Sequence, residues 1–346
     1  MRWRIALALA FTLAACAGCA GDRSIDGAML AVVSYSPDEV VLLDPETLSV
    51  ADRVPLRSMG TSPVALPGRR AFVTAQCGGV GTDSDDALAV IDLRSEGRVE
   101  YVDLPTPNPC GLCVLPDGRL AVVHGVWDGH GLATTIVDLE GGDIAGGGTL
   151  SNVAGSPVAA GGWLWSIGPE GADETSMSTT VRRTTYDLGT SAVIAECDGE
   201  ALLMLSDGND ADTVLRVESR GGSAIVERRA TRDFALAAQA TVPGVREAIS
   251  SGIVIGEFIV LSDGTGADVS DPGGPLLVLD RVSLSEVRRI DVGGCVSSMA
   301  AIGDTLYAVS WRTGEVTAVD PASGEVLRRA AIPGCEGKTL QMAAME

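Results

Sequence analysis

The sequence predicts an all-β fold, a seven-bladed β-propeller in which each blade is a four-stranded antiparallel sheet. Three observations predict it. An apolar run that ends in aspartate recurs along the chain, a motif rich in Pro and Gly lies between these runs, and no segment has a convincing helical period of 3.6 residues. Four short strands per repeat, with turn residues between them, are typical of propeller blades.

The aspartates set the period of the repeat. Asp44 and Asp92 are 48 residues apart, and the next step, to Asp138, is 46 residues. Two weaker copies fill the long gap before Asp280, so the chain has seven repeats. Their aspartates are Asp44, Asp92, Asp138, Asp187, Asp233, Asp280 and Asp320.

Each of these aspartates has a local structural explanation. A carboxylate at the end of a strand can accept hydrogen bonds from the amides of the following turn. Pro45 and Pro321 fix φ in the turns after Asp44 and Asp320. In the second of these turns, Gly324 supplies a positive φ. We therefore interpret the aspartates as hairpin-turn residues and not as catalytic acids.

The second motif marks the junctions between repeats. Its copies are residues 61–63, 108–110, 155–157, 242–244, 293–295 and 333–335, and each precedes another pair of apolar runs.

The chain begins and ends out of phase with the repeat. Residues 29–33 occupy the place of a second strand, and residues 339–344 occupy the place of a first strand. The C-terminal strand is therefore predicted to complete the N-terminal blade, which would close the ring and hide two sheet edges.

The repeats resemble those of the YVTN or YncE-like and NHL-type propellers. The resemblance is carried by the turn at Pro116, Asp117 and Gly118, by strands of the type at residues 89–92, and by Thr-Gly turns. It covers residues 28–345, with blades four and five matching poorly. It implies a propeller but no particular activity.

The N-terminal residues predict export and a lipid anchor. Arg2 and Arg4 precede an uncharged stretch, residues 5–15, which is too short to span a bilayer and reads as the apolar part of a signal peptide. Residues 13–16 resemble the lipobox of bacterial lipoproteins. This implies a signal over residues 1–15, acyl chains such as palmitate on Cys16, a tether over 16–27 and a single domain over 28–346. The alternative is an ordinary secretory signal cut near Ala20.

The residue after Cys16 bears on the membrane that would receive the anchor. In lipoproteins of diderm bacteria, Asp at this position favours retention in the inner membrane, and this chain has Ala17 there. The resemblance therefore implies the outer membrane if the source is diderm.

The charge balance excludes nucleic-acid binding. The chain has 46 acidic and 25 basic residues, a net charge of −21, which becomes −23 once Arg2 and Arg4 are removed, and Lys338 is its single lysine. Phosphate contacts need clustered cations. An apolar content of 46% also excludes a disordered acidic chain. Anionic lipid would repel so acidic a body, so only the acyl chains would hold it at the membrane.

Acidic loops are candidates for a Ca²⁺ site. Residues 81–86, 170–174 and 262–268 each follow a predicted second strand, which would place them on one face of the disc. Their oxygen-rich side chains suit Ca²⁺ better than Zn²⁺. The alternative is that they are solubilising loops. A similar segment, residues 206–212, falls between a first and a second strand, on the opposite face. The candidate ligands are Asp83, Asp85, Asp86, Asp263 and Asp268.

Histidines offer little for catalysis. His124 and His130 fall in one predicted loop with Asp128, a spacing that permits a metal or proton-transfer site, although surface residues are the alternative. No Ser-His-Asp constellation, phosphate-binding glycine loop or HExxH zinc motif is present.

The cysteines predict disulfides, because an exported chain meets an oxidising compartment. Cys295 and Cys335 occupy the same junction position in two successive repeats, so a bond between them would lock the ring shut. Cys77 and Cys110 are predicted to lie on one side of neighbouring blades. Cys110 and Cys113 could instead form a redox or metal-binding CxxC pair.

These observations favour a monomeric binding or scaffold propeller of the cell envelope, attached to the membrane through its lipid. Its partner would be an envelope protein or a small-molecule ligand, with no nucleic acid. The alternative is a lactonase-like or quinoprotein-like enzyme, which would need carboxylates and arginines at the channel mouth together with a divalent ion or a quinone. Because propellers host both binding and catalysis, the fold alone does not decide between them.

Overall fold

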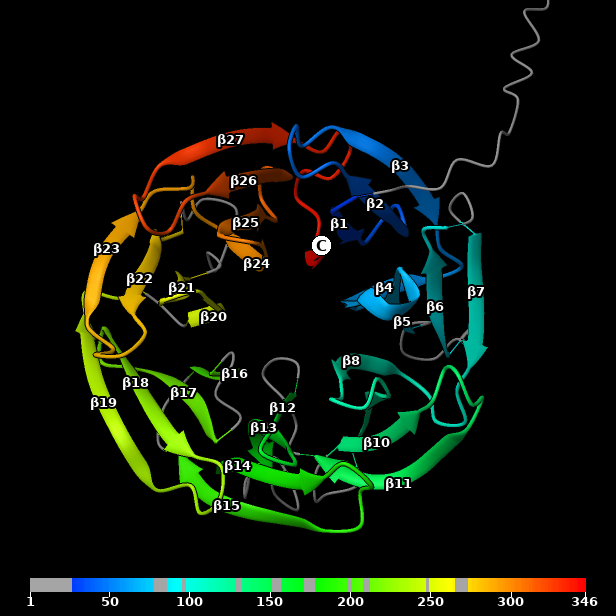
Figure 1. Cartoon of the computed structure of the whole chain (residues 1–346), viewed down its shortest axis with the longest axis horizontal. Coiled ribbons are helices and arrows are strands. Elements are labelled where there is room, and N and C mark those ends of the chain that lie inside the picture. Colours follow the sequence, from blue (N-terminus) through cyan, green and yellow to red (C-terminus); the bar gives the residue numbers. More distant parts are fainter. Residues whose placement is uncertain are drawn as a thin grey trace, which may run out of the picture.

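Seven four-stranded antiparallel sheets surround a common axis in a computed structural model of the chain (Figure 1). The structure describes residues 27–77, 86–94, 98–127, 132–150, 157–170, 178–197, 201–207, 212–246, 249–264 and 273–346. The predicted fold class is confirmed, including the number of blades and the four strands in each.

Successive blades use successive strands, counted from the axis outward. Blade one contains β28 (Leu340–Met345), β1 (Met29–Ser34), β2 (Glu39–Leu43) and β3 (Val50–Pro55). Blade two contains β4 (Met59–Leu66), β5 (Ala71–Cys77), β6 (Ala87–Asp92) and β7 (Arg98–Asp103), with the short 3₁₀ helix η1 (Pro67–Arg69) after β4. Blade three contains β8 (Pro109–Val114), β9 (Leu120–Trp127), β10 (Leu132–Val137) and β11 (Ile144–Leu150).

The remaining four blades follow the same plan. Blade four contains β12 (Val158–Ala160), β13 (Trp163–Glu170), β14 (Ser178–Thr185) and β15 (Ser191–Cys197). Blade five contains β16 (Ala201–Ser206), β17 (Thr213–Arg220), β18 (Ser223–Ala230) and β19 (Leu236–Pro243). Blade six contains β20 (Ile249–Ile255), β21 (Phe258–Asp263), β22 (Leu276–Asp280) and β23 (Glu286–Ile290). Blade seven contains β24 (Val296–Ile302), β25 (Thr305–Ser310), β26 (Glu315–Val319) and β27 (Val326–Ala331).

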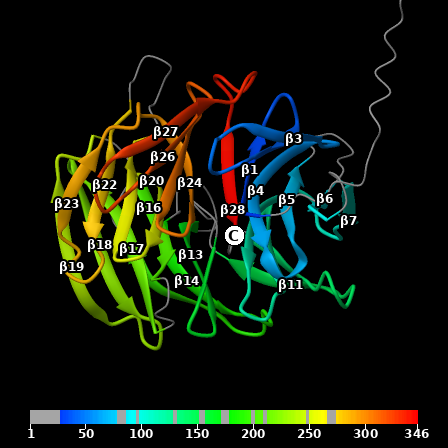
Figure 2. The same ribbon diagram turned by 45° about the horizontal axis from the view of Figure 1, so that its top comes forward.

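The ring closes as the ends of the chain predict. Strand β28 pairs antiparallel with β1, from Met29 opposite Met345 to Ser34 opposite Leu340. Figure 2 shows this C-terminal strand in red beside the blue strand β1. The innermost strand of blade one therefore comes from the other end of the chain, and the closure holds the first and last repeats together.

The inner and middle strands, such as β1 and β2, are mostly apolar because both of their faces are buried between neighbouring blades, whereas the outermost strands, such as β3 and β27, are largely exposed. Side chains alternate along β1, so Leu30 and Val32 contact blade seven while Ala31 and Val33 contact blade two. Seven clusters of buried apolar residues result, one at each interface between neighbouring blades. A blade is thus stabilised mainly by its two neighbours.

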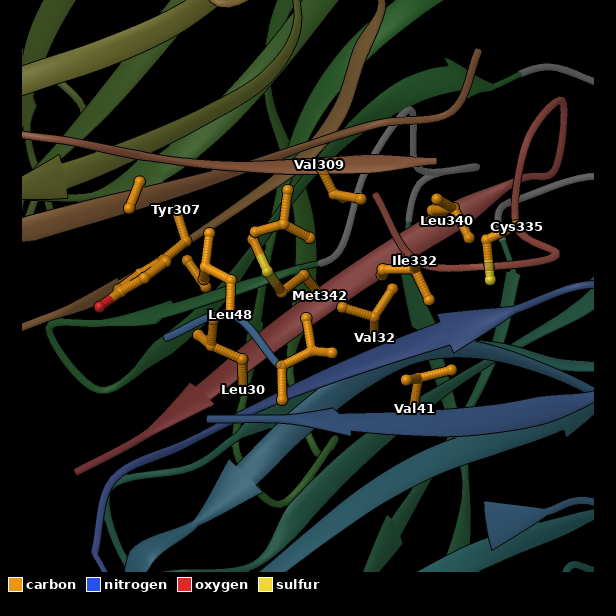
Figure 3. Packing of buried hydrophobic residues seen from close by; sticks show 14 residues of the cluster. Leu30, Val32, Val41, Leu48, Tyr307, Val309, Ile332, Cys335, Leu340 and Met342 are labelled. Carbon is orange, nitrogen blue, oxygen red and sulfur yellow. The ribbon is translucent and has the colours of Figure 1, made fainter. Parts of the chain in front are cut away.

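The cluster at the closure shows how the last repeat joins the first. Leu340 and Met342 on β28 pack with Leu30 and Val32 on β1 and with Val309 on β25 (Figure 3). All five side chains are buried. Because this cluster combines residues from both ends of the chain, its loss would open the ring.

The seven periodic aspartates are hairpin-turn residues, as predicted. Each accepts at least one hydrogen bond from a backbone N–H two or three residues further along. Asp138 Oδ1, for example, accepts from Glu140 and from Gly141, at 2.9 Å each. The donors at the other six aspartates are the amides of Thr47, Arg94, Gly189, Ala235, Ser283 and Ala322.

Hydrogen bonds to these carboxylates should make the protein sensitive to acid. The Ser323 hydroxyl and the turn amide of Ala322 hold the pKa of Asp320 below its ordinary value of 3.8, and the amide of Thr47 lowers the pKa of Asp44 in the same way. A lowered pKa in the folded state adds stability that is present above the ordinary pKa and is lost as the pH falls through the lowered pKa. We therefore expect the free energy of unfolding to decline below about pH 4.

Urea titrations across this range would measure the decline. Asp320→Asn should lower stability at neutral pH and flatten part of the loss below pH 4, because the titrating group has been removed. Asp304→Asn, in the exposed turn between β24 and β25, is the control and should follow the wild-type profile. Equal acid sensitivity of D320N and wild type would contradict the explanation.

Arginines connect the outer strands of neighbouring blades. Arg53 of blade one donates to the carbonyl of Pro333 in blade seven at 2.8 Å, and Arg329 of blade seven donates to the carbonyl of Asp291 in blade six at 3.1 Å. Arg289 of blade six likewise donates to Gly244 of blade five at 2.8 Å. A guanidinium presents several fixed donors, which suits this contact better than the single ammonium group of lysine.

The N-terminal residues 1–26 lie outside the described part of the chain, so the export signal, the anchor on Cys16 and the tether remain predictions. Within the described residues, no helix has the length and apolar character needed to cross a bilayer.

Candidate functional site

A cavity on the ring axis is the candidate site. It has a volume of about 360 Å³ and is lined by the innermost strands of six blades. Figure 1 shows these strands, β4, β12, β16, β20, β24 and the C-terminal strand, arranged around the centre of the ring. The lining residues are Ser62, Pro63, Pro157, Val158, Leu203, Met204, Leu205, Ser251, Gly252, Ser297, Ser298, Met299, Gln341 and Met342.

Irregular pairing in the inner strands is what places polar residues at this cavity. The register of β4 with β5 shifts between Thr61 and Val64, and that of β24 with β25 shifts between Val296 and Ser298. Each shift is a β-bulge or similar irregularity, which leaves a residue out of the ladder and re-aims its side chain. Ser62 lies in the first of these shifts and has a φ of +48°.

One side of the cavity carries a collar of hydrogen bonds that crosses three blade interfaces. Gln341 Oε1 accepts from Thr61 Oγ1 at 3.0 Å and from the amide of Ser62. Ser62 Oγ donates to the carbonyl of Cys110 at 2.9 Å. Ser297 Oγ donates to the carbonyl of Leu340 at 2.7 Å. The collar therefore runs from blade seven through blades one and two to blade three.

Gln341 is the polar group of the collar that is best placed for a ligand. Both bonds to its oxygen come from blade two, so the orientation of its amide is fixed. Within the described residues, no protein group accepts from its Nε2, which carries two donor hydrogens. The amide therefore presents donors to the cavity that it lines.

The opposite part of the wall is apolar. Pro157, Val158 and Leu203 belong to blades four and five, and Met299 and Met342 continue the apolar surface toward the closure. The described lining as a whole consists of hydroxyl, amide and apolar groups. Such a wall binds an uncharged molecule by contact area on one side and by a few oriented hydrogen bonds on the other.

The strands that lead into the acidic loops have the positions that the sequence predicts. β5, β13 and β21 are the second strands of blades two, four and six, and β16 and β17, on either side of the fourth acidic segment, are the first and second strands of blade five. Most residues of the four loops lie outside the described part of the chain. Of the five candidate Ca²⁺ ligands, Asp83, Asp85 and Asp268 lie outside the described residues.

Asp86 and Asp263 each accept a backbone hydrogen bond just before an innermost strand. For Asp86 this is β8 of the next blade, and for Asp263 it is β20 of its own blade. Asp86 Oδ1 accepts from the amide of Asn108, and Asp263 Oδ1 accepts from the amide of Arg246, both at 2.8 Å. The two lie in different blades. Within the described ranges, no three His, Cys, Asp or Glu side chains are grouped so as to hold a metal ion.

His124 is a buried structural residue and not part of a loop. It belongs to β9, where one ring nitrogen lies 3.0 Å from the carbonyl of Pro107 and the other lies 2.8 Å from Thr135 Oγ1. Burial lowers its pKa. Both nitrogens are therefore occupied. Its predicted companions His130 and Asp128 are outside the described residues.

The two candidate disulfides are absent from the structure. Cys77, Cys110, Cys295 and Cys335 form no disulfide bond among the described residues. Cys295 and Cys335 occupy equivalent positions in two successive repeats, and each is buried at its own blade junction, so the ring closes through strand pairing and apolar packing.

A reactive CxxC pair is also disfavoured. Burial raises the pKa of Cys110 to about 11 and that of Cys113 to about 12. At neutral pH both sulfurs are protonated, whereas the thiolate is the form that attacks disulfides and binds metals. The CxxC spacing in β8 therefore fits strand packing.

The cavity residues lie in segments that the sequence marks as turns between repeats. Residues 61–63 and 155–157 each contain a Ser-Pro pair, and Ser62, Pro63 and Pro157 line the cavity. Paired serines at 250–251 and 297–298 occupy similar places in blades six and seven. This recurrence of serine at the start of inner strands is the signal that could have indicated the channel wall.

No protein-family model matches the chain, and no curated protein matches it. The solved structures do provide matches. The periplasmic gluconolactonase PpgL of Pseudomonas aeruginosa is 15% identical, with 90% of this chain and 98% of that chain covered and a TM-score of 0.63. A functionally unknown protein from Desulfotomaculum acetoxidans is 14% identical, with 92% and 99% covered and a TM-score of 0.62.

A third similar structure, the dihydro-heme d1 dehydrogenase NirN, is 12% identical, with 91% of this chain and 74% of that chain covered and a TM-score of 0.55. At these identities the likeness establishes the fold alone. The chain is a seven-bladed β-propeller similar in architecture to proteins of several different activities.

Proposed function

We propose that this chain is an exported, lipid-anchored binding protein that holds an uncharged, partly apolar small molecule in its central channel without converting it. The observation that supports this most is the lining of the axial cavity. It combines the oriented amide of Gln341 and several serines with an apolar wall. These groups recognise hydrogen-bond acceptors and apolar surface, and in the described lining none is an acid or a base.

The cavity suits a ligand with acceptor oxygens, such as carbonyl or ether groups, at one end. The Gln341 amide would donate to such an oxygen, while Val158, Leu203 and Met299 would contact the apolar remainder. A charged ligand would lose its hydration on entering the cavity and would meet no opposite charge in the described lining, which costs free energy. The proposed ligand is therefore neutral.

Export and anchoring are supported by the N-terminal sequence. The basic residues Arg2 and Arg4, the apolar stretch of residues 5–15 and the lipobox-like run that ends at Cys16 occur in the order expected for a lipoprotein signal. One structural neighbour, PpgL, is named as periplasmic, which fits this location. The lipid would hold the propeller at the membrane, the outer one if the source is diderm.

Filling the channel tests the function. Val158→Trp adds a large side chain to the cavity wall, so we expect bound ligand to fall at least tenfold. Val193→Trp is the matched control, because Val193 lies exposed on the outer strand β15 of the same blade. The full-length proteins would be extracted from membranes, and small molecules released on denaturation would be identified and quantified by mass spectrometry.

Three results would contradict the proposal. The first is an empty wild-type channel, and the second is equal ligand in V158W and wild type. The third is turnover of glucono-lactone by the wild type that V158W abolishes, which would assign the channel to a lactonase-like enzyme instead. Ligand bound by wild type and V193W, and lost from V158W, would support the proposal.

A further inference from the structure

A second cavity lies away from the ring axis, between blades two and three. It has a volume of about 180 Å³ and opens beside the turns that join β4 to β5, β8 to β9 and β10 to β11. A space of this size holds several water molecules and therefore has room for a small ligand. It shares no lining residue with the axial channel.

Arg69 supplies the cation of this cavity. It ends the 3₁₀ helix η1 and lines the cavity, and its Nη1 is buried without a hydrogen-bond partner in the described structure. Two nearby arginines form ion pairs, Arg94 with Asp92 at 3.1 Å and Arg119 with Asp117 at 2.7 Å, whereas Arg69 acts on Asp92 only through its charge. An unsatisfied buried donor is costly, and a ligand carboxylate would satisfy it with two parallel hydrogen bonds.

Carboxylates lie on the other side of the cavity. Asp138 uses Oδ1 to cap its turn, and Glu140, two residues later, is exposed and makes no ion pair within the described ranges. Asp117 is already neutralised by Arg119. Asp138 and Glu140 form the rim of the cavity and give it a negative charge that attracts a cation. A simple anion bound to Arg69 would be repelled by the same rim.

The walls between these charges are apolar. Leu66, Val114 and Leu139 come from blades two and three and enclose the space beneath the rim. Leu66 is buried and the other two are half-buried. Such walls accommodate an aliphatic side chain and exclude water from the ion pairs, which strengthens them.

We propose that this cavity binds a small zwitterion, a free amino acid with an aliphatic side chain. Its carboxylate would pair with Arg69, its ammonium group with Asp138 and Glu140, and its side chain would contact Leu66, Val114 and Leu139. Charge complementarity selects this class, because a plain cation would be repelled by Arg69 and a plain anion by the rim. The proposal does not depend on the ligand of the axial channel.

Calorimetric titration with L-leucine, L-valine and L-methionine tests the site on the full-length protein. We expect saturable binding of at least one of them. Arg69→Gln should weaken that binding at least tenfold, and Glu140→Gln should weaken it less, because Asp138 remains. Arg232→Gln, an exposed change in blade five, is the control and should bind like wild type.

Two ligand analogues separate the two charges. N-acetyl-L-leucine lacks the ammonium group and L-leucinamide lacks the carboxylate, so both should bind at least tenfold more weakly than L-leucine. Failure of all three amino acids to bind would overturn the proposal, as would unchanged affinity in R69Q. Thermal melting of each variant confirms that it is folded before binding is compared.

Discussion

Deletion of residues 336–346 is expected to unfold the ring. The deletion removes β28, whose residues Leu340, Met342 and Met345 are buried at the closure. Burial of each such side chain is worth about 1.5–3 kcal/mol, so the loss is roughly 5–9 kcal/mol. Whole domains are stable by only about 5–15 kcal/mol. Circular dichroism melting should show a collapse of the cooperative transition.

The deletion also exposes the edge of β1. Six residues of β1 pair with β28, and the collar bonds to Gln341 and Leu340 disappear with the strand. A milder variant keeps the test informative if the truncated chain cannot be purified. Leu340→Ala should cost about 2–5 kcal/mol, whereas Lys338→Gln, outside the strand, should cost little. A truncated protein that melts like wild type would refute the closure as the main lock of the ring.

Replacement of Asp207 by alanine is expected to have the second-largest effect. Asp207 follows β16 in blade five and is buried, with a side chain 1% exposed. Its carboxylate accepts from Arg228 at 2.6 Å, from Thr213 at 2.7 Å and from Arg281 of blade six at 2.9 Å. Removing it leaves two guanidinium groups without their counter-charge between the blades. Breaking a buried pair in this way costs about 3–5 kcal/mol.

The pH dependence of this effect distinguishes the charge from simple packing. Burial alone would raise the pKa of Asp207, but hydrogen bonds from Arg228, Thr213 and Arg281 outweigh it and lower the pKa. The stabilisation is therefore present above the ordinary pKa of 3.8 and is lost as the pH falls through the lowered value. The difference between wild type and D207A in urea should shrink at low pH.

Two controls accompany the Asp207 variant. Asp207→Asn keeps an acceptor but loses the charge, so it should fall between wild type and D207A. Asp233→Ala changes an exposed turn aspartate of the same blade and should cost far less. A D207A protein whose unfolding free energy stays within about 0.5 kcal/mol of wild type, the range usual for surface substitutions, would show that the charged contact between blades five and six contributes nothing.

The repeat could be predicted because its signals are local. The carboxylates of Asp44 and Asp320 bind amides two or three residues away, so the turn chemistry is complete within the printed sequence. The continuous apolar runs of the inner and middle strands also follow directly, because neighbouring blades bury both faces of these strands. Once the first and last strands were found out of phase, the closure followed from the period alone.

Blade five matched the repeat poorly for a reason visible only in three dimensions. On β17, Arg216 and Glu218 occupy buried positions on the face toward blade four, where other blades carry apolar residues. Arg216 pairs with Glu218 and, at 3.0 Å, with Glu227 on the neighbouring strand β18. Ion pairs replace apolar contacts there, and no local sequence pattern predicts that Arg216 pairs with Glu218 and Glu227.

The candidate sites depended on tertiary contacts in the same way. Ser62 and Gln341 are far apart in the chain and meet only because the ring closes. Arg69 reads as an ordinary turn arginine until blade three is placed beside it. The cysteine pairs show the reverse, because equal repeat positions in Cys295 and Cys335 suggested a bond that is absent from the structure.

The sequence by itself determined the number of blades, the four strands of each, the turn role of the seven aspartates and the strand that closes the ring. All of these follow from interactions within about one repeat or from the phase of its ends. Tertiary structure alone decided which polar groups line the axial channel, which charges meet between blades five and six, and which arginine keeps a buried Nη1 without a hydrogen bond in the described part of the chain beside blade three. These depend on side chains brought together from distant repeats, whose distances no period in the sequence encodes.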